Sequence, residues 1–318
     1  MDVAETPWER TLPETIDIIE VGPRDGFQIL PDFIETALKI EVIHSLIDAG
    51  IRRMEIASFV HPRAVPQMRD AHEVVQAVRD AECECFAMVP NLIGAERALE
   101  AGIEMLNLVV SASESHNLSN VRRGIDGSLD GFIPVLELAE HKGASVRASI
   151  ATVFGCPFEG DVPIENVLHV GRRLVDMGCV ELNLCDTTGM ANPRQVAFIA
   201  RRLKDKFQDA KIAMHFHNTR GAGMANLLAA MQEGITSFET SFGGLGGCPF
   251  APGAAGNVCT EDVVHMVHEM GVATGIDVKR LIYAVRYAER KLGLNFSGQV
   301  IRAGRSCDLH PIPVALPA

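Results

Sequence analysis

Two histidines, His215 and His217, end a short apolar run that begins at Lys211. If this run is a β-strand, alternate side chains point to the same face, so both imidazoles face the same way. Two imidazoles on one face predict a metal site, and the alternative interpretation is a pair of hydrogen-bonded or exposed histidines. The motifs described next favour the metal.

A second motif, Gly22-Pro23-Arg24-Asp25-Gly26, follows the first predicted strand and places a guanidinium beside a carboxylate. Buried charges are costly unless they are paired or coordinate a metal ion. We therefore expect Arg24 and Asp25 to share a site with the two histidines.

A third motif, Gly243-Gly244-Leu245-Gly246-Gly247-Cys248, follows the last predicted strand, and Asn257 lies a few residues beyond it. One interpretation is a turn-rich loop with a buried thiol. The other is a lid over the site, because glycines give the backbone freedom and the single thiol of the loop could exchange a proton.

The hydrophobic pattern predicts the elements that would bring these motifs together. Short apolar, β-branched runs alternate with segments of helical period, which predicts parallel strands joined by helices. The predicted strands are Ile16–Val21, Arg53–Ser58, Cys85–Val89, Met105–Ser111, Val146–Val153, Val180–Cys185, Lys211–His217 and Ser237–Phe242. The predicted helices are Phe33–Ala49, Val65–Arg79, Leu129–Lys142, Ile164–Met177, Pro193–Phe207, Gly223–Glu233, Glu261–Ala273 and Val278–Leu292.

Eight such strands predict an α/β fold of the (β/α)8 TIM-barrel class with additional C-terminal helices, in which chemistry lies at the carboxyl ends of the strands. Gly50, Gly102, Gly178 and Gly234 each follow a helical stretch, as C-terminal capping glycines do. A doubly wound sheet is the competing fold, but no GxGxxG follows an early strand. We expect one domain over 1–318, with the barrel at about 16–260 and helices and an aperiodic tail at 261–318.

Composition narrows the function classes. The 318 residues include 29 basic and 41 acidic side chains, for a net charge of −12, which disfavours binding to nucleic acid or an anionic membrane. Because there is no long apolar stretch and no basic, apolar N-terminal signal, we expect a cytoplasmic protein. Eight cysteines are too sparse for a disulfide scaffold, and the CxC at Cys83 and Cys85 lacks the second pair of a structural zinc site.

Six motifs follow one another along the chain: GPRDGFQ at 22–28, EIASFVHPRAVPQM at 55–68, FGCPFEG at 154–160, CDTTGMANP at 185–193, HFHNT at 215–219 and GLGGCPFAPGAAGN at 244–257. In the same order, they closely resemble the motifs of 3-hydroxy-3-methylglutaryl-CoA lyases, a family of the metal-dependent TIM-barrel lyase and aldolase superfamily. The resemblance implies cleavage of an acyl-CoA thioester by retro-Claisen chemistry. With 3-hydroxy-3-methylglutaryl-CoA the products would be acetoacetate and acetyl-CoA.

The resemblance also implies a set of site residues. The metal ligands would be Asp25, His215, His217 and Asn257, and their imidazole and oxygen donors suit Mg²⁺ or Mn²⁺ rather than structural zinc. The catalytic residues would include Arg24, which holds the thioester carbonyl, and Cys248, which protonates the enolate carbon. Asp186 would be linked to deprotonation of the C3 hydroxyl, or would instead be a helix-capping carboxylate with Thr187. Glu55 would be a partner of Arg24 or a support of the metal site. Gln28, Ser58, Asn120, Phe158 and Thr187 would be substrate-pocket or supporting positions.

Some positions depart from the family pattern. Asn218 stands where an aspartate is familiar, and Phe158 and Phe250 stand where tyrosines are. Phe158 therefore predicts a less polar acyl pocket, and an alternative substrate such as citramalyl-CoA or a longer branched analogue. A Claisen-type synthase is disfavoured because little chain follows the last predicted helix, and a catalytically silent CoA-thioester-binding barrel is disfavoured by the intact ligand set. We expect a homo-oligomer, a dimer or a tetramer.

Overall fold

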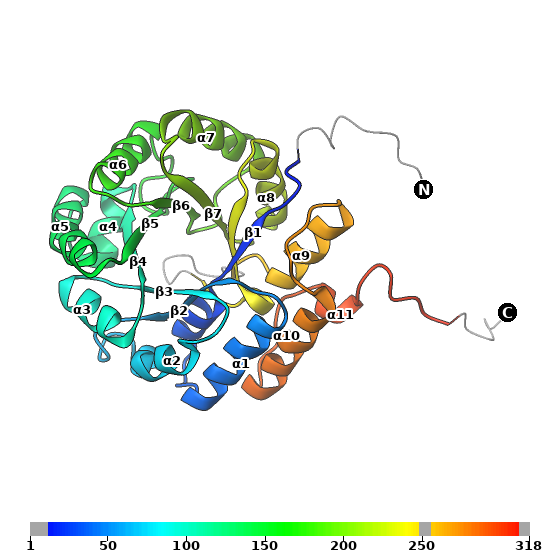
Figure 1. The fold of residues 1–318 in the computed structure, drawn as a ribbon. Helices are drawn as coiled ribbons and strands as arrows, with labels where there is room; N and C mark the ends of the chain where they lie inside the picture. The colour runs from blue at the N-terminus through cyan, green and yellow to red at the C-terminus, as the bar shows by residue number, and fades with distance from the viewer. Residues whose placement is uncertain (1–11, 248–255, 312–318) are drawn as a thin grey trace.

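A computed structural model describes residues 12–247 and 256–311, and its central feature is a closed ring of eight parallel strands. Neighbouring strands pair in chain order, and β8 pairs with β1 to close the ring, as Figure 1 shows looking into the barrel. The strands are β1 (Asp17–Glu20), β2 (Arg53–Ser58), β3 (Glu84–Met88), β4 (Met105–Ser111), β5 (Ser145–Ala151), β6 (Glu181–Asp186), β7 (Lys211–Phe216) and β8 (Ser237–Thr240). The predicted TIM-barrel class is confirmed, with the strands where the hydrophobic pattern put them.

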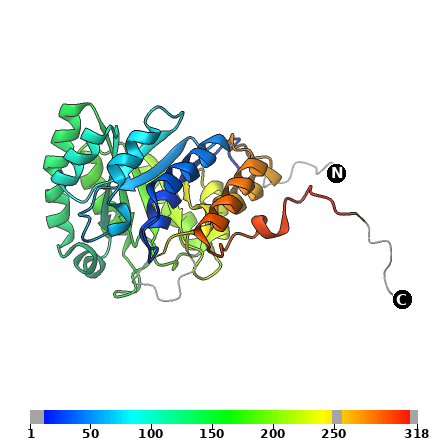
Figure 2. The same ribbon diagram turned by 90° about the horizontal axis from the view of Figure 1, so that it is seen from below.

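Helices surround the ring. They are α1 (Thr36–Asp48), α2 (Ala71–Val78), α3 (Leu92–Ala101), α4 (Glu114–Val121), α5 (Ile125–Lys142), α6 (Ile164–Asp176), α7 (Pro193–Lys206) and α8 (Gly223–Gln232), followed by α9 (Thr260–Glu269), α10 (Val278–Leu292) and α11 (Val300–Ala303). Figures 1 and 2 show α10 beside α1, so the C-terminal helices cover one side of the barrel.

The structure corrects the sequence predictions in places. The segment predicted as one helix at 65–79 is a 3₁₀ turn at Pro66–Met68 followed by α2. The tail predicted to be aperiodic contains α11, and α3 and α4 were not among the predicted ranges. The predicted capping glycines are confirmed, because Gly50, Gly102, Gly178 and Gly234 all have positive φ, a conformation that only glycine adopts at no steric cost.

The apolar core has two parts of unequal size. The large part lies between the strands and the helices, and the small part, which includes Ile19, Val21, Phe86 and Ala213, lies inside the ring. The ring also holds a fully buried guanidinium, Arg147, stacked over the Phe86 ring at 4.5 Å. The inside of the barrel is thus partly ionic.

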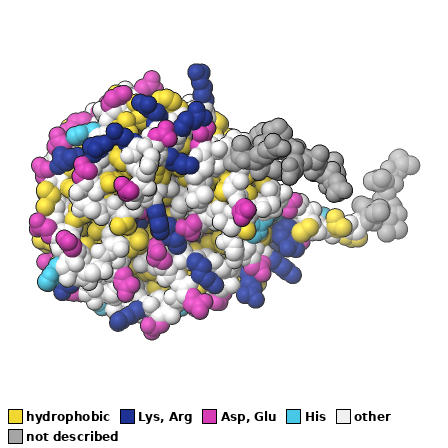
Figure 3. Space-filling view, turned by 45° about the horizontal axis from the view of Figure 1, so that its top comes forward, with side chains coloured by type: hydrophobic (Ala, Val, Ile, Leu, Met, Phe, Trp, Pro, Cys, Tyr) yellow, Lys and Arg dark blue, Asp and Glu magenta, His cyan; other side chains and the backbone are white. Residues whose placement is uncertain are grey.

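On the face drawn in Figure 3, basic and acidic side chains are interspersed over the helices. Within the described ranges, no helix combines the length and the apolar character needed to cross a bilayer.

Candidate active site

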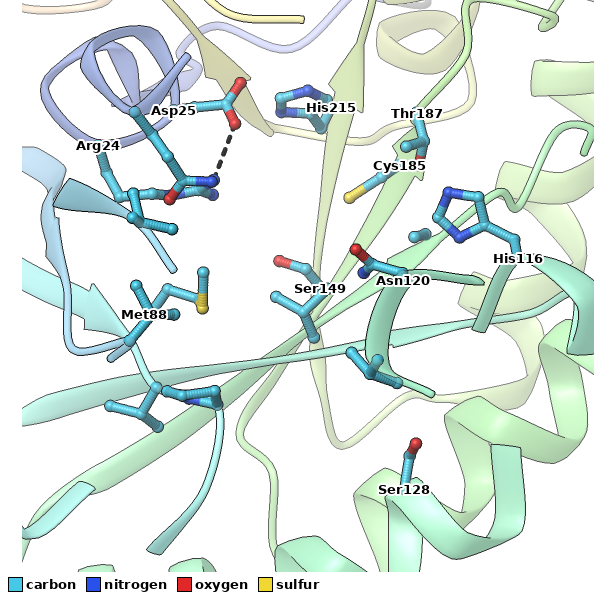
Figure 4. Close-up of a pocket in the computed structure, with 18 of the residues that line it drawn as sticks. Arg24, Asp25, Met88, His116, Asn120, Ser128, Ser149, Cys185, Thr187 and His215 are labelled. Atoms are coloured by element: carbon cyan, nitrogen blue, oxygen red, sulfur yellow. Dashed lines mark hydrogen bonds and ion pairs between the residues drawn. The ribbon is translucent and has the colours of Figure 1, made fainter. Parts of the chain in front are cut away.

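Three predicted metal ligands meet at the carboxyl ends of the strands. Asp25, His215 and His217 each offer a ligand atom, and these atoms lie within 4.8 Å of one another. Asp25 sits on a π-helical turn at Gly22–Gly26, directly after β1, while His215 lies on β7 and His217 is the first residue after it. Figure 4 shows Asp25 facing His215 at one side of the cavity. The period-2 geometry of a strand brings the two imidazoles to one face, as predicted.

His215 has a buried acidic partner. Its Nδ1 lies 2.9 Å from Oε2 of Glu239, which is the residue opposite His215 in the pairing of β7 with β8. Burial alone would raise the pKa of Glu239, but the Arg147 guanidinium and the His215 ring hold it well below its usual range. An ionised carboxylate can only accept, so Nδ1 carries a proton and Nε2 is the ring nitrogen left to bind a metal.

The other two ligands also hold the protonation states that a metal requires. Burial, together with the neighbouring His215, lowers the pKa of His217 to about 3, so this ring is neutral. Burial opposes ionisation of Asp25, but Arg24 and His215 lower the pKa of its carboxyl below the ordinary value. Burial opposes protonation of His215, but its hydrogen bond to Glu239 raises the pKa of the ring above the ordinary value, so a metal bound at Nε2 would compete with a proton there.

Asn257 lies against this cluster. Its Nδ2 donates to Oδ2 of Asp25 and to the Leu245 carbonyl, both at 2.8 Å. Its buried Oδ1 has no hydrogen-bond partner in the described part of the chain, and the same holds for Nδ1 of His217. A carboxylate, two imidazoles and a buried amide are donors that fit a hard divalent cation.

The Gly-rich loop reaches the same cluster through Gly246. This residue has φ +112°, and a Cβ there would lie 2.3 Å from Nδ2 of Asn257 and 2.6 Å from Oδ2 of Asp25. Glycine is needed at Gly246 for both the backbone conformation and the close approach. Cys248, the predicted proton donor of this loop, lies outside the described residues.

Arg24 is held between two acids beside the cluster. Its Nη1 donates to Oδ1 of Asp25 at 2.8 Å, and it also pairs with Oε2 of the fully buried Glu55. The other oxygen of Glu55 accepts from Nδ2 of Asn107 at 2.7 Å. Glu55 is therefore a partner of Arg24, one of the two roles predicted for it. The acid that contacts a metal-site histidine is Glu239.

A cavity of about 560 Å³ opens from the cluster across the barrel mouth. Arg24, Asp25, His215 and His217 line it, and the predicted substrate positions Gln28, Asn120 and Thr187 line it as well. The other two predicted substrate positions, Ser58 and Phe158, do not line the cavity. Ser58 is buried with its hydroxyl 3.7 Å from Sδ of Met88, and Phe158, 52% exposed beside His116, is not a lining residue.

Asp186 ends β6 and is 1% exposed; its neighbours Cys185 and Thr187 line the cavity, but Asp186 does not. Its Oδ1 accepts from the backbone N–H groups of Met190 at 2.8 Å and Ala191 at 3.0 Å. Its buried Oδ2 has no hydrogen-bond partner among the residues that the structure describes. Burial raises the pKa of Asp186 to about 6, which is suitable for a group that takes up a proton near neutral pH.

Sequence reasoning missed Glu239 and Asn107. The signal for Glu239 was a single acid inside the apolar strand Ser237–Phe242, since a charge there requires a buried partner. Asn218, by contrast, keeps a structural role despite its departure from the family pattern, because its Oδ1 accepts from the backbone of Gly223 at the start of α8.

Comparison with known proteins agrees with this geometry. The HMGL-like family model matches residues 15–287. The chain is 44% identical to a hydroxymethylglutaryl-CoA lyase of Bacillus subtilis, over 88% of this chain and 94% of that protein. It is 41% identical to the (R)-citramalyl-CoA lyase of Chloroflexus aurantiacus, over 92% of this chain and 95% of that protein. A solved HMG-CoA lyase of Acinetobacter baumannii, in complex with coenzyme A and 3-methylmalate, is similar with a TM-score of 0.90 and 42% identity, over 98% of this chain and all of that one.

Proposed function

This chain belongs to the HMGL-like family and is a carbon–carbon lyase, and from this premise we propose that it cleaves 3-hydroxy-3-methylglutaryl-CoA to acetoacetate and acetyl-CoA. The observation that carries the proposal is the cluster of Asp25, His215 and His217, within 4.8 Å of one another, beside Arg24 in a cavity at the barrel mouth. Metal-dependent chemistry is a property of this family, and the cluster supports it.

The ion is proposed to be Mg²⁺ or Mn²⁺, held by Asp25, His215, His217 and Asn257. Thiolates, the ligands typical of structural zinc, are absent from this set. When bound, the ion would supply Lewis-acid polarisation of substrate oxygens.

The chain's own residues would divide the chemistry among them. Asp186, with its free Oδ2, is proposed to take the proton of the C3 hydroxyl. The C2–C3 bond then breaks, C3 becomes the ketone of acetoacetate, and the electron pair of the bond passes to C2 as the enolate of acetyl-CoA.

Arg24 is proposed to hold the thioester oxygen on which the negative charge of the enolate develops. Its guanidinium is fixed by Glu55 and Asp25, so it needs no rearrangement during the reaction. Cys248 is proposed to donate a proton to C2, which completes acetyl-CoA. Gln28, Asn120 and Thr187 would contact the substrate from the cavity wall.

Citramalyl-CoA is a second candidate substrate, favoured by the 41% identity to a citramalyl-CoA lyase over nearly the whole of both chains. The same bond cleavage applied to it would yield pyruvate and acetyl-CoA. We further propose that the chain acts as a single domain and assembles as a dimer or tetramer.

The test is a panel of CoA thioesters incubated with the purified protein and Mg²⁺ or Mn²⁺, with acetyl-CoA and the keto acid identified separately. Acetoacetate from 3-hydroxy-3-methylglutaryl-CoA, abolished in Asp25→Asn, is the expected result. Pyruvate from citramalyl-CoA at a higher kcat/KM would move the assignment to the second candidate, and no acetyl-CoA from any thioester would refute both.

A further inference from the structure

The cavity described above has a second end, far from the metal cluster, that the chemistry does not use. This end is lined by residues that follow β3 and β4, among them Asn91, Arg123, Ser128 and Gly131. Figure 4 shows Ser128 at the opposite side of the drawn cavity from Arg24 and Asp25. In the closed ring β5 lies opposite β1, and α5 packs outside β4 and β5, so the cavity crosses the barrel mouth.

Arg123 presents a cation at this end. Within the described ranges its guanidinium makes no hydrogen bond or ion pair, and it lies against Gly131, where a Cβ would be 3.0 Å from its Nη1. Its backbone is tied down, because Nδ2 of the buried Asn117 donates to the Arg123 carbonyl at 2.9 Å and to Oγ of Ser128 at 2.8 Å.

The nearby acids are engaged elsewhere. Glu114 accepts from the backbone N–H of Ile125 at 2.9 Å, and Asp130 pairs with Arg173 at 2.8 Å. Asp126 lies 3.4 Å from His169 and 3.6 Å from Arg173. In a chain with a net charge of −12, a cation left unpaired on the wall of a ligand cavity favours an anionic ligand at that place.

We propose that Arg123 binds a phosphate group of the coenzyme A moiety and so fixes the direction in which the thioester crosses the barrel mouth. This inference rests on the proposed function, because it takes the ligand to be an acyl-CoA.

The length of the ligand matches the path. An eight-stranded barrel is ~15 Å across, given the usual strand spacing and tilt, and the helix layer lies outside it. The pantetheine arm that separates a thioester from the first phosphate is about as long as five extended residues, ~17 Å. A thioester held at Arg24 therefore places its phosphates near the α5 side of the mouth. A guanidinium also offers the forked donors that match phosphate oxygens.

The test compares Arg123→Gln with wild type for calorimetric binding of coenzyme A, 3′-dephospho-coenzyme A, 4′-phosphopantetheine and pantetheine. Arg122→Gln is the matched control, because Arg122 is the neighbouring cation and is exposed, as Arg123 is, but does not line the cavity. We expect Arg123→Gln to weaken binding of coenzyme A by about three- to tenfold and to leave binding of pantetheine unchanged. Arg123→Lys should restore part of the loss, and Arg122→Gln should bind coenzyme A as the wild type does.

Dephospho-coenzyme A identifies the phosphate. If Arg123→Gln still weakens its binding, the contact is with the diphosphate, and if not, the contact is with the 3′-phosphate; both outcomes support the proposal. Unchanged binding of coenzyme A in Arg123→Gln would overturn it, and so would an equal loss for pantetheine. These binding results are independent of turnover, so a protein that binds coenzyme A through Arg123 without cleaving any thioester would refute the proposed function alone.

Discussion

Glu239→Gln is a direct test of how the protein prepares a histidine for metal binding. Both carboxylate oxygens of Glu239 accept, one from Nη1 of Arg147 at 2.6 Å and the other from Nδ1 of His215 at 2.9 Å. A glutamine has one acceptor oxygen and one NH₂ donor, so it can serve only one of these donors. Arg147 cannot give up its protons, and we expect the glutamine oxygen to turn towards it. The NH₂ group then faces His215, which is forced to carry its proton on Nε2, where the lone pair for the metal should be.

The expected magnitude follows from these contacts. Loss of the partner of a metal-binding histidine reduces metal affinity by roughly 10–100-fold. Because Glu239 also neutralises the fully buried Arg147, the variant should lose stability as well, by up to roughly 3–5 kcal/mol. Metal affinity and stability must therefore be measured separately, by titrating metal-free protein with Mn²⁺ and by denaturant unfolding.

Glu181→Gln is the matched control. Glu181 accepts from Nε of Arg147 at 2.8 Å, so this variant removes the same kind of charge from the same arginine without touching His215. We expect it to lose stability while keeping its Mn²⁺ affinity within about threefold of wild type. Wild-type Mn²⁺ affinity in Glu239→Gln, or an equal loss of affinity in Glu181→Gln, would refute the tautomer reasoning.

Three further predictions concern Glu261, Arg24 and Phe158. Burial raises the pKa of Glu261 to about 8, above its ordinary value of 4.5, so its ionisation opposes folding and stability is lost as the pH rises from about 4.5 through 8. Glu261→Gln should remove roughly 2–3 kcal/mol of the stability that wild type loses between pH 6 and pH 9, and identical pH dependence of unfolding in the two proteins would contradict this. Arg24→Lys should lose about 100-fold or more in kcat but little Mn²⁺ affinity, because lysine keeps the positive charge but lacks the planar guanidinium that pairs with both Glu55 and Asp25. A wild-type kcat in this variant would remove Arg24 from the mechanism. Phe158→Tyr should change the ratio of kcat/KM for 3-hydroxy-3-methylglutaryl-CoA and citramalyl-CoA by less than about twofold, because the Phe158 ring is 52% exposed and does not line the cavity, and a tenfold change would place it against the acyl group.

Most of the fold follows from sequence periodicity, and the exceptions have physical reasons. Helix α4 gives no apolar stripe because its buried residues are the polar His116 and Asn117, while Leu118 and Val121 are 48% and 40% exposed. The Arg24–Asp25 motif was predicted only to follow the first strand, and it forms a π-helical turn, which sequence patterns do not reveal. The strands themselves were predictable because each is buried over most of its length and contains several apolar residues, although polar residues such as Glu55, Asn107 and Arg147 interrupt the apolar runs.

The site could be predicted only where its geometry is local to a motif. His215 and His217 lie two residues apart, so the period of a strand is enough to bring them together. Glu239 reaches His215 through the register of β7 with β8, which a single sequence does not fix. The prediction that Phe158 lines the acyl pocket relied on its motif, and the motif gives the position of the backbone without the direction of the ring.

The charges around the site explain how it can accept a divalent cation and an anionic substrate together. Glu239, Arg147 and Glu181 form a buried chain that continues to Arg53, and Arg53 reaches Asp17 and Glu84 at the opposite end of the barrel. Glu181 and Glu239 thus each have a cationic neighbour, which limits the desolvation cost of placing ions inside the ring. Nearest the cavity, the acids Asp25, Glu55 and Glu239 outnumber the guanidiniums Arg24 and Arg147 by one charge. A divalent cation at Asp25, His215 and His217 would reverse that sign, so the same interior that attracts the metal would, once loaded, favour the carboxylate and the developing enolate of a 3-hydroxyacyl-CoA.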